Sequence, residues 1–394
     1  MLARSLVQGL SIGTKNMSTL ASYQSVRRSK QIRYVVTGLT IGGVSIYYAV
    51  TNKAYAWWGS SDLDKSKWMA DAITKPDTLK EDKDNMRVKM ELLIMRIQGE
   101  VCRALEGLEP EHQKFMVDRW ERKEGGGGIS CVLSDGKTFE KAGVNVSVVH
   151  GMLPAGAAQQ MRSRGKKLKE GKLPFFACGI SSVIHPRNPN CPTVHFNYRY
   201  FEVTEEDGNK QWWFGGGTDL TPCYIEEQDI VHFHKTYKTA CDKHDKSYYQ
   251  KFKTWCDDYF YIKHRGERRG VGGIFFDDLD TPSQNEAFNF VKSCAESVVP
   301  SYEPIVKRNM NKGYGYADRQ WQLLRRGRYV EFNLVYDRGT KFGLLTPGAR
   351  IESILMSLPT YAKWEYKHSP KDGTREAELL EANLARTCSC TCNI

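Results

Sequence analysis

The sequence lacks any pair of cysteines in C-x-x-C spacing, although it contains 11 cysteines. That spacing is typical of structural zinc sites, so its absence argues against such a site and against a regular disulfide framework. Most of the cysteines stand among apolar or loop residues and are expected to be small buried side chains. The four to which this applies most clearly are Cys178, Cys191, Cys223 and Cys294.

Acidic residues are missing from residues 1–61, which contain seven Lys or Arg. A basic, Ser- and Thr-rich start of this kind is typical of an organellar transit peptide. It includes 19 uncharged residues, 34–52, marginally long enough to span a bilayer. We therefore predict that residues 1–61 are a mitochondrial targeting and sorting leader, leading to the intermembrane space and to peripheral or anchored association with the inner membrane. A retained anchor and a plastid transit peptide are the alternatives.

The remaining residues carry 50 basic against 46 acidic side chains, so most of the formal net charge of +11 belongs to the leader. A basic patch that would bind nucleic acid is therefore not expected. The four glycines at 125–128 lack the Lys-Ser/Thr that follows in a phosphate-binding loop. We interpret them as a permissive linker.

Periodicity predicts an α+β protein with an antiparallel or mixed sheet, because consecutive strands are often joined by short turns. A helix is expected over 86–108, with a helical continuation over 114–123. A hairpin is expected around Ser134-Asp135-Gly136. Further strands are expected at 175–184, 193–203, 211–214, 271–276 and 329–336, and further helices at 226–243, 248–262, 284–299, 352–356 and 374–386.

The segment VHFNYRYFEV at 194–203 alternates in character with the period of a strand. His195, Asn197 and Arg199 therefore share one face, while bulky residues including Phe196 and Tyr198 bury the other. A face with a proton-transfer group, an amide and a fixed cation suits an anionic, heteroatom-rich ligand better than a core.

Two other segments offer partners for such a ligand. Ser181 lies on a segment that ends in a rigid, proline-containing turn, and Asp219 follows three glycines that allow close approach to a ligand. For Asp219, a helix cap and a ligand contact are equally well supported. Near the C-terminus, Arg325, Arg326 and Arg328 are expected to enter a strand. The triplet Gly348-Ala349-Arg350 is expected to open a helix and bind a carboxylate.

His234 shares the inward face of its predicted helix with Ile230, Tyr237 and Cys241. An inward histidine is more often a hydrogen-bonded core residue than a ligand. A metal site built from His185, His195, His234 and His264 is the minority alternative, because none of the spacings is diagnostic.

The motifs SSVIHPRNP, VHFNYRYFEV, WWFGGGTDLTP and RRGRYVEFNLVYDRGTKFGLLTPGARIES together resemble the oxygen-dependent coproporphyrinogen III oxidase family of haem biosynthesis. The resemblance covers about residues 86–381. It implies a large antiparallel sheet with helices on both faces, and oxidative decarboxylation by O2 of the ring A and B propionates of coproporphyrinogen III, giving protoporphyrinogen IX. It implies no required cofactor, O2 as co-substrate, and a homodimer with its interface near Ser130–Phe139 and Tyr329–Glu365.

The resemblance also assigns roles to residues. His195 matches the proposed proton donor and Asp219 the acid thought to engage the pyrrole N–H groups. The matched substrate-binding residues are Ser181, Asn197, Tyr198, Arg199, Gly348, Ala349 and Arg350. Tyr198 belongs to the opposite face of the strand, so a backbone contact or a local bend is expected there.

We thus expect a leader at 1–61, a single catalytic domain at 62–381 and a Cys-rich tail at 382–394. The tail contains Cys388, Cys390 and Cys392, and its role is left open. Two rival functions are a histidine-coordinated metal-dependent oxygenase and a non-catalytic tetrapyrrole carrier.

Overall fold

Seven antiparallel strands form one sheet at the centre of the computed structural model, which describes residues 64–110, 113–345 and 349–384. The strand order is β1-β2-β3-β4-β5-β6-β9, so the first six strands follow one another in space as in sequence. Their bounds are Met116–Glu121, Gly126–Ser134, Phe139–Met152, Pro174–Pro186, Thr193–Thr204, Lys210–Thr221 and Gly272–Leu279. A separate hairpin pairs β7 (Tyr261–Ile262) with β8 (Glu267–Arg268).

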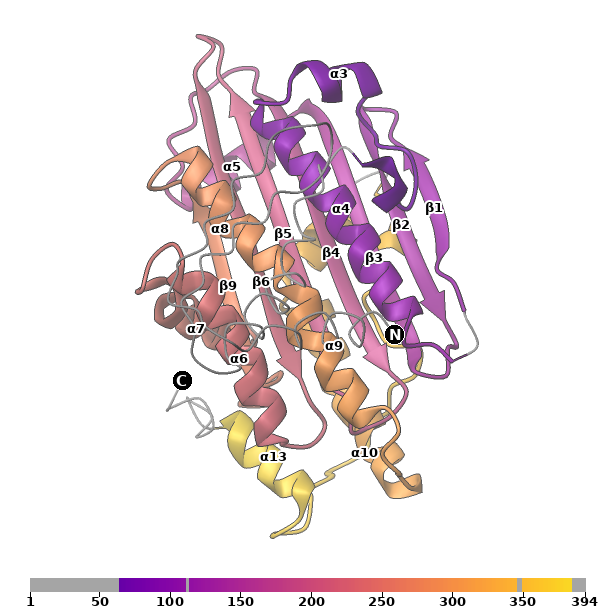
Figure 1. The fold of residues 1–394 in the computed structure, drawn as a ribbon. Coiled ribbons are helices and arrows are strands. Elements are labelled where there is room, and N and C mark those ends of the chain that lie inside the picture. The colour runs from indigo at the N-terminus through magenta and orange to yellow at the C-terminus, as the bar shows by residue number, and fades with distance from the viewer. Residues whose placement is uncertain (1–63, 111–112, 346–348, 385–394) are drawn as a thin grey trace, which may run out of the picture. The chain divides into compact units, whose positions relative to one another are not determined.

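One face of the sheet is covered by four helices, as Figure 1 shows. They are α4 (Met86–Glu106), α6 (Glu227–Asp242), α8 (Gln284–Glu296) and α9 (Val298–Asn309). The row Ile129, Val146, Ile180 and Tyr198 runs across four strands on this side, and all of these side chains are fully buried. Burying so many large apolar groups supplies the main driving force for folding.

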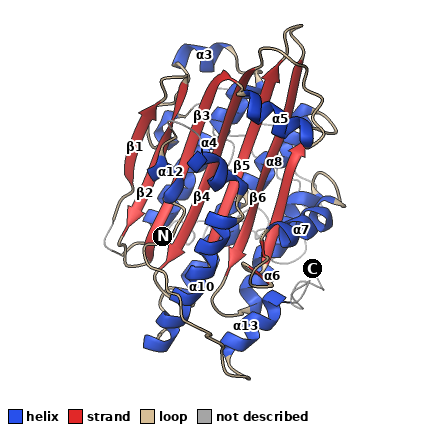
Figure 2. Ribbon diagram, turned by 180° about the vertical axis from the view of Figure 1, so that it is seen from behind, coloured by secondary structure: helices blue, strands red, loops and turns tan. Residues whose placement is uncertain are grey.

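The opposite face is only partly covered (Figure 2). Helix α10 (Tyr316–Val335) lies over one end of it and α5 (Ala155–Ser163) over the other, while the short helix α12 (Ile351–Leu355) lies nearer the middle of the strands, on the β2 side. At the β9 edge, α7 (Tyr248–Tyr259) wraps around the sheet, because its Phe252 contacts Phe276 on one face and its Tyr259 stacks on Phe275 on the other. The remaining elements are η2 (Lys65–Lys67), α3 (Pro76–Glu81), α11 (Arg338–Leu345) and α13 (Arg375–Leu384).

The predicted α+β class, with a large antiparallel sheet and helices on both faces, is confirmed. The predicted helix at 86–108, the hairpin at Asp135 and the strands at 175–184, 193–203 and 271–276 are confirmed within a few residues. The predicted inward position of His234 on α6 is also confirmed, since its side chain is fully buried. The four cysteines expected in the interior are buried. Among the described residues, no helix has the length and hydropathy needed to cross a membrane.

Three predictions of local structure are wrong. Residues 116–121 of the possible helix at 114–123 form β1, and the supposed glycine linker belongs to β2. Gly128 lies beneath the Trp120 ring, where a β-carbon would come within 2.3 Å of a ring atom, so close packing explains this glycine. The expected strand at 329–336 is the end of helix α10, where Tyr329, Phe332 and Asn333 are buried with helical spacing.

The arginines expected to enter that strand lie on α10 instead. Helix α10 tolerates burial of these charges because each has an acidic partner. Arg326 pairs with the fully buried Glu140 of β3, and Arg325 pairs with Glu267 of β8. A buried charge without such a partner would be strongly destabilising.

Candidate active site

Strand β5 places His195, Asn197 and Arg199 on the sparsely covered face of the sheet, where all three are half-buried. The intervening residues Phe196 and Tyr198, and Tyr200 after them, are fully buried on the opposite face. The alternation predicted from the sequence is therefore confirmed.

Small residues of the neighbouring strands form a floor beside these three side chains. Directly opposite Asn197 lie Ser181 of β4 and Gly217 of β6, and the same row continues through Asn145 and Ser130. The row through Arg199 contains Gly179 and Gly215, and continues through Ser147 and Gly128. Four strand spacings from β2 to β6 make the floor about 19 Å wide. A surface of this breadth suits a large flat ligand better than a single small anion.

The imidazole ring of His195 is hydrogen-bonded to a buried carboxylate. Its Nδ1 lies 2.7 Å from Oδ1 of Asp219, the residue directly opposite on β6. Arg269 donates from Nη2 to both oxygens of the same carboxylate, at 2.9 and 2.8 Å. The contact with Asp219 favours the imidazole tautomer with hydrogen on Nδ1. Nε2 is then left on the other side of the ring, without a hydrogen-bond partner among the described residues.

The charges of this group stabilise one another. Burial alone would raise the pKa of Asp219, but the positive charge of Arg269 and the hydrogen bond from His195 outweigh it and hold that pKa below its ordinary value. The Arg269 guanidinium lies 4.1 Å from the centre of the Phe260 ring and 4.5 Å from that of Tyr329. Asp219 is thus a permanent anion that orients and supports His195.

The predicted contact between Asp219 and a pyrrole N–H stays a prediction. Only 2% of the Asp219 side chain is exposed, and its oxygens face His195 and Arg269. The helix-cap interpretation of Asp219 is wrong, because the residue lies within strand β6.

Three arginines converge on one carboxylate at the Arg199 side of the floor. Asp277 of β9 accepts hydrogen bonds from Arg199 at 2.7 Å, from Arg338 at 3.1 Å and from Arg164 at 3.4 Å. Burial acts to raise the pKa of Asp277, but Arg199 and Arg338 bring it below its ordinary value. The side chains of Arg199 and Arg338 are 38% and 49% exposed, so N–H donors remain accessible to an incoming anion.

Tyr198 is a site residue by resemblance only. Its hydroxyl group contacts Thr218 Oγ1 at 2.6 Å on the buried face, so the side chain points away from the floor. Only its backbone lies between Asn197 and Arg199.

Of the triplet at 348–350, Arg350 lies at the far end of the floor, over β1. Gly348 is outside the described residues. Arg350 immediately precedes α12, forms an ion pair with Asp118 of β1 and lies over the Trp120 ring. Ser353 Oγ of α12 is 2.9 Å from Ser130 Oγ. The structure therefore brings Arg350, next to Ala349, to the same face as Ser181, Asn197 and Arg199, at the opposite edge of the floor.

The four histidines of the minority metal hypothesis do not assemble. His185 contacts the Ser357 carbonyl and Thr193, His234 contacts the Val271 carbonyl and Tyr249, and His264 contacts Glu331 and Tyr336. Each of these three rings thus has both nitrogens engaged by its own neighbours. Across the described ranges, no group of three or more His, Cys, Asp or Glu side chains is placed to hold a metal ion.

Arg269, Asp277, Arg164 and Arg338 are absent from the residues predicted from the sequence. The one local signal for Asp277 is the pair Asp277-Asp278 at the end of the apolar run GGIFF. Arg269 stands among other arginines and glycines in RGERRGVGG, and nothing in that segment distinguishes it from its neighbours. Its role depends on tertiary contacts with β6 and α10.

Together, the sheet face and its side chains define a site for a broad, polyanionic, heteroatom-containing ligand, equipped with one group able to transfer protons. Comparison with known proteins identifies the class. Residues 89–387 match the coproporphyrinogen III oxidase family, and the chain belongs to that family.

Its relatives share most of their length with it. The chain is 60% identical over 375 residues to the oxygen-dependent coproporphyrinogen-III oxidase of Drosophila melanogaster, a match that covers 93% of this chain and 96% of that protein. It is 66% identical over 318 residues to the mitochondrial oxygen-dependent enzyme of Rattus norvegicus, covering 80% of this chain and 72% of that protein. The match to the chloroplastic coproporphyrinogen-III oxidase 1 of Arabidopsis thaliana is 56% over 302 residues, or 76% of this chain and 78% of that protein.

Proposed function

We infer that this protein is an oxygen-dependent coproporphyrinogen III oxidase of haem biosynthesis. The observation that carries this inference is the joint presence, on one sheet face, of His195 over a buried carboxylate and of the partly exposed arginines Arg199 and Arg338. In each of two rounds, a propionate side chain loses CO2 and one β-hydrogen, with the two electrons of that C–H bond, and becomes a vinyl group. Those two electrons, the proton of the β-hydrogen and one proton from the medium pass to one O2, giving hydrogen peroxide.

The arginines around Asp277 would bind propionates. Three guanidinium groups share this carboxylate, so the cluster keeps positive charge for the ligand. Arg350, across the floor, is suited to a propionate on another ring. Ser181 and Asn197 between them offer hydrogen-bonding groups to the macrocycle. The backbone of Tyr198 runs beside them, and Gly348 and Ala349 would complete the Arg350 edge.

His195 would move protons between the substrate and the reduced oxygen. An imidazole whose Nδ1–H is held by Asp219 accepts a proton at Nε2 and can donate it back. Arg269 and Asp219 act through His195, so they are positioning residues in this proposal. No cofactor is required in it, and O2 is the only co-substrate.

Incubation of the purified protein with coproporphyrinogen III tests the activity. Under air we expect CO2 release and a product with two vinyl groups, and under argon we expect neither. Binding without turnover under air would instead support the non-catalytic carrier. Activity lost on chelation and restored by one metal ion, with that ion present in stoichiometric amount, would support the metal-dependent oxygenase.

We propose that the enzyme is a homodimer that uses the predicted segments. Several apolar side chains are exposed in and next to the segment Tyr329–Glu365, including Leu334, Val335, Phe342, Leu345 and Trp364. In the segment Ser130–Phe139, most apolar side chains are buried within the chain, and Ser134, Asp135 and Lys137 face outwards. Exposed apolar side chains concentrated in one segment of a chain are often covered by a partner.

Light scattering on Leu345→Glu tests this interface. We expect a monomer, whereas Met152→Glu, at an exposed methionine outside both segments, should remain dimeric. A dimeric Leu345→Glu variant would exclude the interface at α11.

We further propose that residues 1–61 direct the protein to the mitochondrial intermembrane space. Two mammalian relatives, of rat and human, are named mitochondrial, whereas plant relatives are named chloroplastic. A reporter fused to residues 1–61 should be imported and become protease-sensitive when the outer membrane is ruptured. Carbonate extraction would show whether the apolar part, residues 34–52, remains as an anchor.

A further inference from the structure

A cavity of about 140 Å³ lies between α10, the β7–β8 hairpin and α13. Three arginines contribute to its wall, namely Arg265, Arg325 and Arg328, and Trp321, Leu324 and Leu380 supply apolar surface. The cavity is separate from the sheet-face site. The residues of α10 that point towards that site are Arg326 and Tyr329, and neither of them lines the cavity. A cavity of this size is far too small for a tetrapyrrole.

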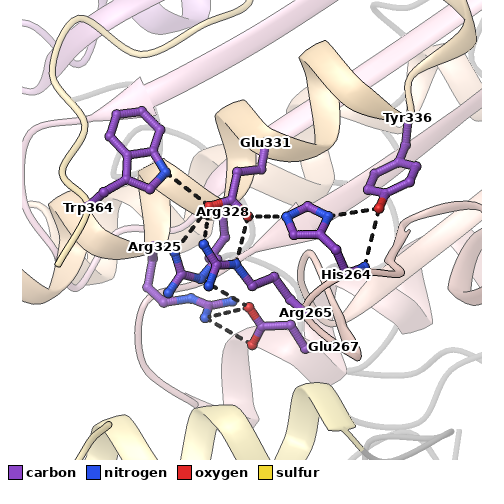
Figure 3. A network of polar contacts seen from close by, with 8 residues as sticks. All are labelled: His264, Arg265, Glu267, Arg325, Arg328, Glu331, Tyr336 and Trp364. Carbon is purple, nitrogen blue, oxygen red and sulfur yellow. Dashed lines mark hydrogen bonds and ion pairs between the residues drawn. The ribbon is translucent and has the colours of Figure 1, made fainter. Parts of the chain in front are cut away.

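The three guanidinium groups share two carboxylates (Figure 3). Arg265 donates to both oxygens of Glu331 at 2.8 and 2.7 Å, and Arg328 reaches the same carboxylate at 3.3 Å. Nη1 of Arg325 donates to both oxygens of Glu267 at 3.1 Å. The group therefore keeps one positive charge in excess. Crowding of like charges is also seen in Arg328, whose pKa is lowered by burial and then by repulsion from Arg265.

Arg325 has donors without acceptors. Only 5% of its side chain is exposed, and neither Nε nor Nη2 has a hydrogen-bond partner among the described residues. Buried N–H donors in proteins are almost always paired, and a charged group left partly unpaired is especially unfavourable. An acceptor bound in the adjoining cavity would complete the coordination of Arg325.

We propose that this cavity binds a small oxyanion, a carboxylate or a phosphate, through Arg325 with help from Arg328 and Arg265. The apolar wall beside Trp321 accommodates a short organic group attached to the anionic head. The planar, multi-donor guanidinium is suited to oxyanions of either kind.

The position of the cavity connects it with His195. Glu267, which holds Arg325, is two residues before Arg269, which holds Asp219. Helix α10 contributes Arg325 to the cavity and also Asn333, which accepts a hydrogen bond from Arg269. An anion in the cavity would therefore stabilise the two elements that position Arg269.

Isothermal titration of the full chain with inorganic phosphate, and separately with acetate, tests the proposal at constant ionic strength in chloride. We expect one saturable site per chain for at least one of the two anions, and their relative affinities identify the preferred head group. Thermal unfolding should show a rise of about 2–5 °C in Tm at saturating anion. If neither phosphate nor acetate gives more heat of binding than a matched titration with chloride, the proposal is overturned.

Variants locate the site. The double substitution Glu267→Met with Arg325→Met removes the buried pair without leaving an unpaired charge, and should weaken binding at least tenfold. Leu380→Phe, which narrows the cavity and changes no charge, should also weaken it. Arg162→Gln, an ion-paired arginine outside the cavity, and Arg338→Gln, in the sheet-face cluster, should bind within twofold of the wild type. Binding lost in Arg338→Gln and retained in Leu380→Phe would assign the anion to the sheet face and refute this site.

Discussion

The carboxylate of Asp219 lies 2.7 Å from Nδ1 of His195, directly across the β5–β6 pair. Because the carboxylate is also held by the buried Arg269, it cannot turn away from the histidine without leaving that cation unpaired. The ring of His195 is thereby fixed in orientation, and its proton-accepting nitrogen is directed away from Asp219.

Replacing His195 by Gln should lower kcat by about 10²- to 10³-fold, the usual contribution of a proton-transferring side chain, with KM changed little. Steady-state assays of vinyl product against substrate concentration measure both constants. Near-normal kcat in this variant would exclude a proton-relay role.

Asp219→Asn should lower kcat and also destabilise the fold by about 3–5 kcal/mol, because Arg269 would lose its buried partner. The matched control is Asp229→Asn, at another buried carboxylate, paired with Arg308 of α9. That variant should lose stability in urea unfolding but keep kcat. Equal kcat values for the two variants would contradict the positioning role of Asp219.

Arg164→Gln should raise KM for coproporphyrinogen III by about 3- to 10-fold while leaving kcat nearly unchanged, as expected for a partly exposed cation that binds a propionate in ground and transition states alike. Arg162→Gln, two residues earlier in the last turn of α5, is the control, since its partner is Glu170 and not Asp277. An unchanged KM in Arg164→Gln would remove Arg164 from the binding cluster.

Substitutions of two glycines in the floor should have different effects, one on KM and the other on stability. In Gly215→Ala the new β-carbon would lie 2.7 Å from Nη2 of Arg199 and Oδ1 of Asp277, two side-chain ends that can shift, so we expect a raised KM in a folded enzyme. In Gly217→Ala it would lie 2.4 Å from the Ile274 carbonyl oxygen, which belongs to the rigid sheet, so we expect loss of stability. Thermal unfolding and KM measured on both variants, with Gly156→Ala on the exposed start of α5 as control, test this difference.

Stability should fall as the pH drops below about 6.5. Burial, followed by the charge of Lys253, lowers the pKa of His234 to about 3, and burial with the charge of Arg326 lowers that of His185. Between about pH 6.5 and pH 3 the unfolded chain binds a proton at His234 that the native state does not, which costs about 1.4 kcal/mol per pH unit. Urea unfolding from pH 7 to pH 5 should show a shallower decline for His234→Gln than for wild type.

The strand face could be predicted because it depends on a local rule. Alternation along β5 is set by the backbone, so His195, Asn197 and Arg199 could be grouped without knowing any other strand. The partners of these residues could not be predicted in the same way. Asp277 reaches Arg199 only because β9 is the neighbour of β6, although 50 residues separate the two strands.

Helix α10 shows a second reason why part of the structure could not be predicted from the sequence. Its segment YVEFNLVY is rich in β-branched and aromatic residues and alternates enough to predict a strand. The salt bridges of Arg326 with Glu140 and of Arg325 with Glu267 anchor the helix to β3 and β8. Tertiary contacts thus override local propensity, and the identity of those contacts is invisible in the segment itself.

The pairing of β5 with β4 and β6 has a consequence for the quality of newly made protein. A slip by one residue would exchange the two faces, placing Phe196, Tyr198 and Tyr200 in solvent and the Arg199 charge in the apolar interior. A misfolded molecule of this kind would be inactive and would also display a stripe of aromatic rings to chaperones and proteases. The same alternation of side chains therefore assembles the site in the correct register and exposes aromatic rings in molecules with the wrong one.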